Sequence, residues 1–173
     1  PREDGGATGV NGENSANRNT QPDSGAVYIY LRNTPTPWGS QAYVKASNTY
    51  AGDQFGSSID MHGNKLLIGA MQESACQETM DRLRCSVSGV GAAFLFTGAG
   101  QNWVQESYLK QPSGRAGDGF GASVALHDGS AIIGATGADG SGAAYFVTLP
   151  YVSNASVGKF TSGYASITRY GQS

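Results

Sequence analysis

A pair of repeated segments constrains the fold of this chain more than any other feature. The segment AGDQFGSSI at residues 51–59 returns as AGDGFGASV at residues 116–124, and LIGA at 67–70 returns as IIGA at 132–135. The segment at 38–45 also returns, as residues 103–110, with the same spacing of 65 positions. Because whole units recur, the chain is a repeat protein in which each unit must stack on a neighbour to bury its apolar side.

The composition favours β-structure and argues against two classes of partner. Among 173 residues there are 26 glycines, only 14% of the residues are charged and 10% are aromatic. Few segments carry a helical periodicity, so an all-β fold is expected. The net charge is -2 and the basic residues are scattered, so the chain offers no basic patch for nucleic acid. No apolar run reaches the roughly 20 residues of a membrane helix, and no membrane span is expected.

The order of strand and turn signals predicts the shape of one unit. Residues 55–61 alternate, a tight turn follows at 62–64, and residues 65–70 are nearly all apolar. A third strand follows a loop of variable length, and the segment WxxxxYxK forms a fourth. The third strands are predicted at residues 25–30, 91–96 and 142–147. A four-stranded antiparallel meander with glycines in its inner strands is what a β-propeller blade requires.

The paired words Phe-Gly and Gly-Ala resemble the FG-GAP repeat, a family found in the propeller heads of integrin α chains and in many bacterial secreted proteins. The residues that carry the resemblance are Phe55, Gly56, Gly69 and Ala70 in one unit and Phe120, Gly121, Gly134 and Ala135 in the next. The resemblance covers roughly residues 1–149, although Met71 and Thr136 stand where the family usually has proline. It implies an extracellular or cell-surface location, with the periplasm as an alternative.

Aligned in this way, the chain holds about two and a half blades, which form an incomplete ring. Residues 1–46 would supply the third and fourth strands of a first blade, after an Asn-rich loop. Residues 47–111 would form a full second blade and residues 112–149 a third. The tail at 150–173 would be an outer strand or an inter-subunit segment. Since propellers use about four to eight blades, the expected partners are the remaining blades of a longer chain or further copies of this one.

A loop at residues 71–90 breaks the symmetry of the repeat and carries both cysteines, Cys76 and Cys85. A disulfide between them is the simplest interpretation and favours an oxidising compartment. A zinc site is a weaker alternative, because neither histidine lies in this loop. Insertions specific to one unit often bind partners, so a possible contact surface is formed by Met80, Asp81, Arg82, Leu83 and Arg84. The alternative is a solvent-exposed loop that the disulfide protects from proteolysis.

The remaining candidate sites have structural interpretations. Asp53 and Asp118 precede the Phe-Gly words, and a carboxylate repeated in each unit is more often an acceptor for turn amides than a catalyst. His62 and His127 flank turns and are expected to be exposed rather than to share a metal. The turns at these histidines are too short to hold the calcium site of the family. Loops at 11–23 and 139–141 carry oxygen ligands, with calcium as the lesser alternative to plain turns.

No enzyme signature stands out, so no catalytic residue and no cofactor is expected. The favoured function is a non-catalytic extracellular propeller segment for adhesion, recognition or assembly, with an unknown protein or glycan ligand. A second hypothesis is a structural subunit of an extracellular fibre or surface array, joined through open blade edges. A third is an accessory scaffold of a secreted hydrolase whose catalytic residues lie elsewhere.

Overall fold

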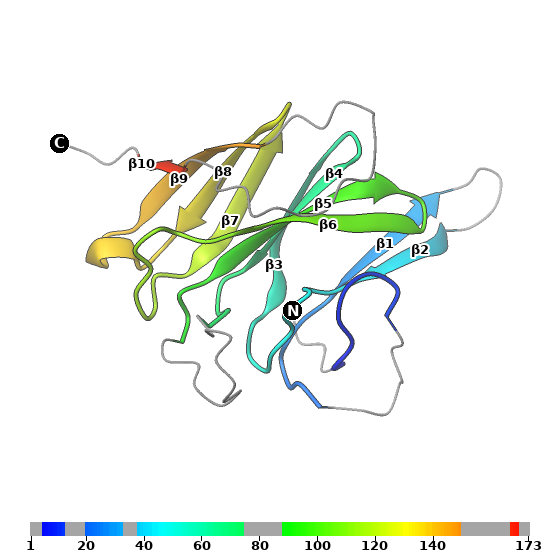
Figure 1. Ribbon diagram of the computed structural model, residues 1–173, viewed down its shortest axis with the longest axis horizontal. Coiled ribbons are helices and arrows are strands. Elements are labelled where there is room, and N and C mark those ends of the chain that lie inside the picture. Colours follow the sequence, from blue (N-terminus) through cyan, green and yellow to red (C-terminus); the bar gives the residue numbers. More distant parts are fainter. Residues whose placement is uncertain (1–4, 13–19, 33–37, 75–87, 150–166, 170–173) are drawn as a thin grey trace.

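The computed structural model describes residues 5–12, 20–32, 38–74, 88–149 and 167–169, the last of these as backbone only. The fold in these residues is all-β, as predicted; the helical structure that they contain is one 3-10 turn, η1, at Ala138–Gly140. Ten strands form three antiparallel sheets, which lie side by side in chain order (Figure 1). Partial propeller blades are therefore confirmed as the building units.

The first sheet has two strands, β1 (Val27–Arg32) and β2 (Trp38–Val44). The second is a complete meander in the order β3-β4-β5-β6, as the sequence predicts for a blade. Its strands are β3 (Phe55–His62), β4 (Lys65–Ala70), β5 (Ala92–Ala99) and β6 (Asn102–Leu109). The short turns after β3 and β5 explain the antiparallel pairing, since tight turns can join only antiparallel neighbours.

The third sheet repeats the second, with β7 (Phe120–His127), β8 (Ser130–Ala135) and β9 (Ala143–Thr148). A fourth strand, β10 (Ile167–Arg169), comes from the tail of the chain and pairs antiparallel with β9. In both complete sheets the register shifts at the same place, between Phe55 and Ser58 in β3 and between Phe120 and Ser123 in β7. A β-bulge thus follows each Phe-Gly word and bends the inner strand.

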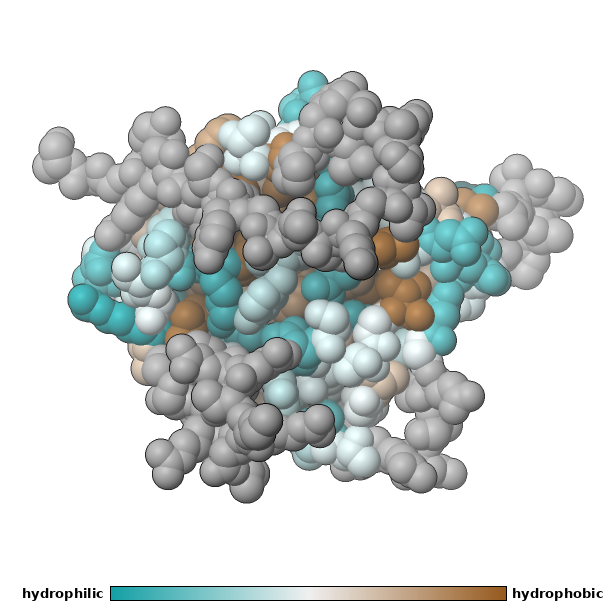
Figure 2. All heavy atoms as spheres, in the orientation of Figure 1, coloured by the Kyte–Doolittle hydropathy of each residue, from teal (hydrophilic) through white to brown (hydrophobic). Residues whose placement is uncertain are grey.

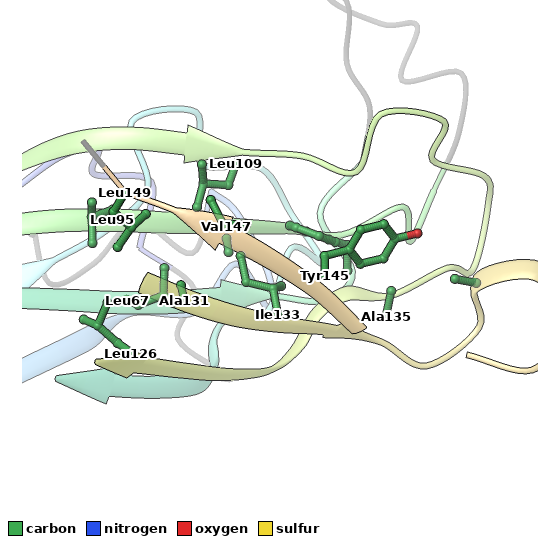
Figure 3. Close-up of a cluster of buried hydrophobic side chains, with 13 residues drawn as sticks. Leu67, Leu95, Leu109, Leu126, Ala131, Ile133, Ala135, Tyr145, Val147 and Leu149 are labelled. Atoms are coloured by element: carbon green, nitrogen blue, oxygen red, sulfur yellow. The ribbon is translucent and has the colours of Figure 1, made fainter. Parts of the chain in front are cut away.

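Two hydrophobic clusters join the three sheets. One contains Val27 and Val44 of the first sheet with Phe94 and Phe96 of the second. The other joins Leu67 and Leu95 of the second sheet to the third, and Figure 3 shows side chains from both sheets pointing into the same space. The two faces of the middle sheet are therefore both buried, each against a different neighbour. This arrangement explains why its central strand β4 reads as an almost unbroken apolar run.

Candidate functional site: the joints between the sheets

The same backbone ladder joins each pair of neighbouring sheets. At the first joint the amides of Gly52, Gln54 and Phe55 donate to the carbonyls of Pro22, Asp23 and Ser24, with N···O distances of 2.7, 3.1 and 2.9 Å. At the second joint the amides of Gly117, Gly119 and Phe120 donate to Ser88, Gly89 and Val90, at 3.2, 3.0 and 2.9 Å. The repeated AGDxF word is therefore a backbone docking element.

A glycine with a left-handed backbone completes each ladder. Gly25 and Gly91 have φ values of 80° and 82°, and a Cβ atom on either would overlap the backbone of Phe55 or Phe120. Only glycine allows both this φ and so close an approach. The predicted structural glycines lie at the same contacts: a Cβ at Gly69 would overlap the carbonyl of Gly121, and one at Gly121 would overlap Ala92.

The phenylalanine of each word anchors the joint with its side chain. Phe55 and Phe120 are almost completely buried. Phe55 meets Phe94 edge-on, with ring centroids 5.3 Å apart, and Phe120 meets Tyr145 in the same way at 5.4 Å. Gly56 and Gly134 also lie where a Cβ would be crowded, within 3.1 Å of Ala26 O for Gly56 and against Ser123 for Gly134.

The repeated aspartates hold the turns that present these words. Asp53 Oδ2 accepts from the amide of Tyr50 and Asp118 Oδ2 accepts from the amide of Arg115, both at 2.8 Å. Asp118 also accepts from the side chain of Gln111. Both carboxylates are buried, so they shape the turn from inside and have little access to a substrate in solution.

A buried polar network beside Asp53 was missed by the sequence analysis. Glu73 is almost fully buried and forms an ion pair with Lys110. It also accepts from Tyr108 Oη at 2.5 Å and from Asn48 Nδ2 at 3.0 Å. Tyr108 and Lys110 belong to the repeated YxK segment, and this repetition is the sequence signal that could have revealed the network. Glu73 has no equivalent in the third unit, where the buried residue Ala138 stands instead.

This network changes the ionisation of two of its members. Burial, and then the charge of Glu73, raise the pKa of Asp53 from 3.8 to about 7, although the hydrogen bond from Tyr50 acts in the opposite direction. Burial and Glu73 also raise the pKa of the Tyr108 phenol well above its usual range. The network ties the end of β6 to the segment that follows β4 within the second unit.

The two histidines are exposed, and the structure brings them together. Their rings touch across the second joint, with centroids 4.6 Å apart. No group of three or more histidine, cysteine or acidic side chains that could hold a metal occurs among the described residues. The segment 139–141 lies in the turn around η1, and Asp139 has a φ of 51°. Cys76, Cys85 and the possible contact surface at 80–84 lie outside the described residues.

A family model described as the FG-GAP repeat matches residues 38–96 and 103–148, more than half of the chain. The chain belongs to the FG-GAP repeat family. FG-GAP repeats form β-propeller-like modules that are generally non-catalytic and typically occur in extracellular or surface proteins. No curated protein matches the chain. Among the described residues, no helix is both long and apolar enough to cross a membrane.

Proposed function

We propose that this FG-GAP chain is a non-catalytic, extracellular propeller segment that functions by binding, and that its two end sheets dock against further FG-GAP blades. One observation carries the proposal. Side chains that are buried at the two joints have repeat equivalents that are exposed on the outer faces of the first and third sheets. The exposed surfaces are therefore the repeat equivalents of surfaces that pack against a neighbouring sheet at the two joints.

The outer face of the third sheet is the first of these surfaces. Leu67 and Leu95 are opposite each other in the second sheet and are fully buried by the third. Their repeat equivalents, Ile132 and Phe146, are also opposite each other but are 51% and 39% exposed. An apolar pair in this position is what a following blade would cover.

The outer face of the first sheet is the second surface. Phe94, Phe96 and Trp103 of the second sheet are buried against the first. Their equivalents on the first sheet are Tyr28, Tyr30 and Trp38, which are exposed. We call the pair Ile132 and Phe146 the trailing face and these three aromatic residues the leading face. On the side of the molecule seen in Figure 2, hydrophobic side chains lie in small patches between polar ones.

The backbone of the third sheet also repeats the acceptor turn. Gly140 and Gly142 have φ values of 76° and 85°, close to the 68° and 82° of Gly89 and Gly91, which receive the AGDxF word at the second joint. A Cβ on Gly91 would overlap Phe120, whereas a Cβ on Gly142 would come no closer than 3.2 Å, to Thr136 O. The turn is therefore shaped for an AGDxF word, and a further FG-GAP blade is the partner of matching chemistry.

Further blades would bring the described sheets toward the roughly four to eight that close a propeller. We propose that loops of the completed propeller recognise an extracellular protein or glycan, and that the 80–84 segment contributes to this surface. A Cys76–Cys85 disulfide would fix that loop in an oxidising compartment. The typical occurrence of FG-GAP repeats in extracellular and surface proteins supports this part of the proposal.

Mass spectrometry of the protein from its native source, under native and then denaturing conditions, tests the docking. We expect a native particle heavier than the 17.9 kDa of this chain. A heavier denatured subunit would place the further blades on the same polypeptide, and a 17.9 kDa subunit in a larger particle would place them on other copies. A 17.9 kDa monomer under native conditions would overturn the proposal.

A fibre or surface array is a second candidate, favoured by the presence of an apolar face on each of the two outer sheets. The two faces differ, so a contact between the leading face of one copy and the trailing face of another is heterologous. Heterologous contacts that do not close into a ring produce open filaments. Electron microscopy of the native particle separates the two candidates. Closed particles of one size support a propeller, whereas filaments of variable length support the array.

A further inference from the structure

His62 and His127 are the two histidines of the chain, and they form one exposed pair. His62 ends β3 and His127 ends β7, each directly before the tight turn into the next strand. Their ring centroids are 4.6 Å apart and the ring planes are inclined by 63°. Among the described residues, neither imidazole forms a hydrogen bond with the protein. Both rings are therefore available to an external ligand.

The pair is held in place by the joint rather than by the rings themselves. Beside it, the carboxylate of Asp60 accepts from the amide of Leu126 at 2.7 Å, which ties β3 to β7. Further along the same strands, Ser58 Oγ donates to the carbonyl of Gly121, also at 2.7 Å. Because the backbones are fixed by these contacts, a ligand would not have to bring the two side chains together, and little entropy would be lost in doing so.

The ring separation suits two imidazoles on one metal ion. With metal–nitrogen bonds of about 2.0–2.1 Å, two histidines on one ion have ring centres roughly 4.5 Å apart at the right angle of octahedral or square-planar sites and roughly 5.2 Å apart at the tetrahedral angle. The observed 4.6 Å lies in this range. Imidazole prefers borderline ions such as Zn²⁺, Cu²⁺ and Ni²⁺ over Ca²⁺ or Mg²⁺, which prefer oxygen ligands.

The charges around the pair have both signs. Lys65 is opposite His62 in the β3–β4 register, and Asp128 follows His127 in the turn. Asp60 lies two residues before His62 on the same strand and uses its carboxylate on backbone amides. With two protein ligands, the remaining positions on a bound ion would be open to water or to a donor group of a partner.

We propose that His62 and His127 form a surface site for a divalent transition-metal ion of the zinc type, which bridges the second and third blades. The site is independent of the docking faces, since it lies at a joint that is already closed. A bound ion would link two units of the repeat and stabilise the joint between them. The expected affinity is moderate, because two ligands hold the ion more weakly than the four of a structural zinc site.

Calorimetric titration of the untagged protein with ZnCl2 alone tests the site. Because thiols could also bind zinc, the protein is used in a Cys76→Ser/Cys85→Ser background. We expect one equivalent of Zn²⁺ to bind, with at least about tenfold weaker binding in His62→Asn and in His127→Asn, and no binding of Ca²⁺. Zn²⁺ should also raise the Tm of the parent protein but not that of the double variant.

Two further readouts keep the test decisive. Both imidazoles should shift together in NMR spectra as the single equivalent of Zn²⁺ is added, and acid should release the ion because imidazole binds metals in its neutral form. Since both side chains are exposed, the asparagine variants should fold with an unchanged Tm in the absence of metal. Zinc binding that survives in the double variant, half an equivalent of metal per chain, or no binding at millimolar Zn²⁺ would overturn the proposal.

Discussion

Asp53 and Asp118 occupy equivalent positions of the repeat but have different neighbours. Both accept a turn amide at 2.8 Å, and both are buried. Only Asp53 has a buried carboxylate close by, because Glu73 is replaced by Ala138 in the next unit. The repeat therefore predicts the shared turn. The pKa of Asp53 is raised first by burial and further by the charge of Glu73, a residue that is not repeated.

Asp53 should make the stability of the protein depend on pH. Its pKa is raised to about 7 in the folded state, so the folded protein holds a proton that the unfolded chain releases above its ordinary value of 3.8. This contribution is fully present below pH 3.8 and is lost as pH rises through about 7, by on the order of 4 kcal/mol. Urea unfolding of Asp53→Asn should show a correspondingly smaller fall in stability between these values.

Asp118→Asn is the matched control, because it alters the same turn hydrogen bond in the next unit. For each variant, the free energy of unfolding is compared with that of the wild type across the pH range. If Asp53→Asn and the wild type lose stability in parallel as pH rises, the assignment of this pH dependence to Asp53 is wrong.

Glu73 should contribute to stability through its ion pair with Lys110. Glu73→Gln retains the size of the side chain but leaves the lysine without its carboxylate, and we expect a loss of about 2 kcal/mol. Chemical denaturation of this variant, of Lys110→Gln and of the double variant gives the coupling energy. Additive effects of the two single changes would contradict a stabilising pair.

Among the strand connections, Gly91 and Gly142 have the same backbone conformation but different surroundings. Substituting each by alanine therefore separates the cost of a positive φ from the cost of a steric clash. Gly91 and Gly142 have φ values of 82° and 85°, so alanine is strained at both, by roughly 1 kcal/mol. Only at Gly91 would the new Cβ also overlap the backbone of Phe120. Thermal unfolding should therefore show Gly91→Ala to be the more destabilised variant. Equal losses would mean that the second joint is not closely packed.

The phenylalanine anchors should be among the most sensitive core positions. Phe55→Ala and Phe120→Ala remove buried rings from the joints, and each should cost about 3–5 kcal/mol in free energy of unfolding. Phe146→Ala is the control, since this ring lies on the exposed trailing face, and we expect a loss of less than about 1 kcal/mol. Tolerance of the substitution at either anchor would contradict the proposed role of the AGDxF word.

Much of the fold could be predicted because its determinants are local. The alternating segment before His62 and the apolar run of β4 define two strands, and short turns leave antiparallel pairing as the simple outcome. The ends of the third strands differ by one to three residues from those predicted; β5, for example, was predicted to end at residue 96 and extends to Ala99. The variable loops before β5 and β9 account for the unequal spacing of the third strands.

The candidate sites were harder to predict because they depend on contacts between units. The two histidines are 65 residues apart, and their contact follows from the side-by-side placement of β3 and β7. The acceptor role of residues 22–24 and 88–90 involves backbone carbonyls, which leave little trace in side-chain patterns. Glu73 lies in the segment that leads into the cysteine-containing loop, whereas its partners Tyr108 and Lys110 lie on β6 and just beyond it.

In the whole molecule, the sheets follow one another in chain order, and both joints are built in the same direction. The first and second sheets each present an acceptor turn and an apolar face to the sheet that follows, which supplies an AGDxF word. Because the two faces of a sheet differ, the leading and trailing faces also differ. In the proposed docking, a partner would have to match the face that it covers, and further blades would add in a defined order.

Hydroxyl-radical footprinting with mass spectrometry, applied to the isolated chain and to the assembly from the native source, tests whether further blades cover the leading and trailing faces. We expect five residues to react in the isolated chain and to be protected in the native assembly: Tyr28, Tyr30, Trp38, Ile132 and Phe146. Val104, which is 62% exposed and lies outside both faces, should react equally in the two samples. Equal oxidation of the leading and trailing faces in both samples would contradict the account.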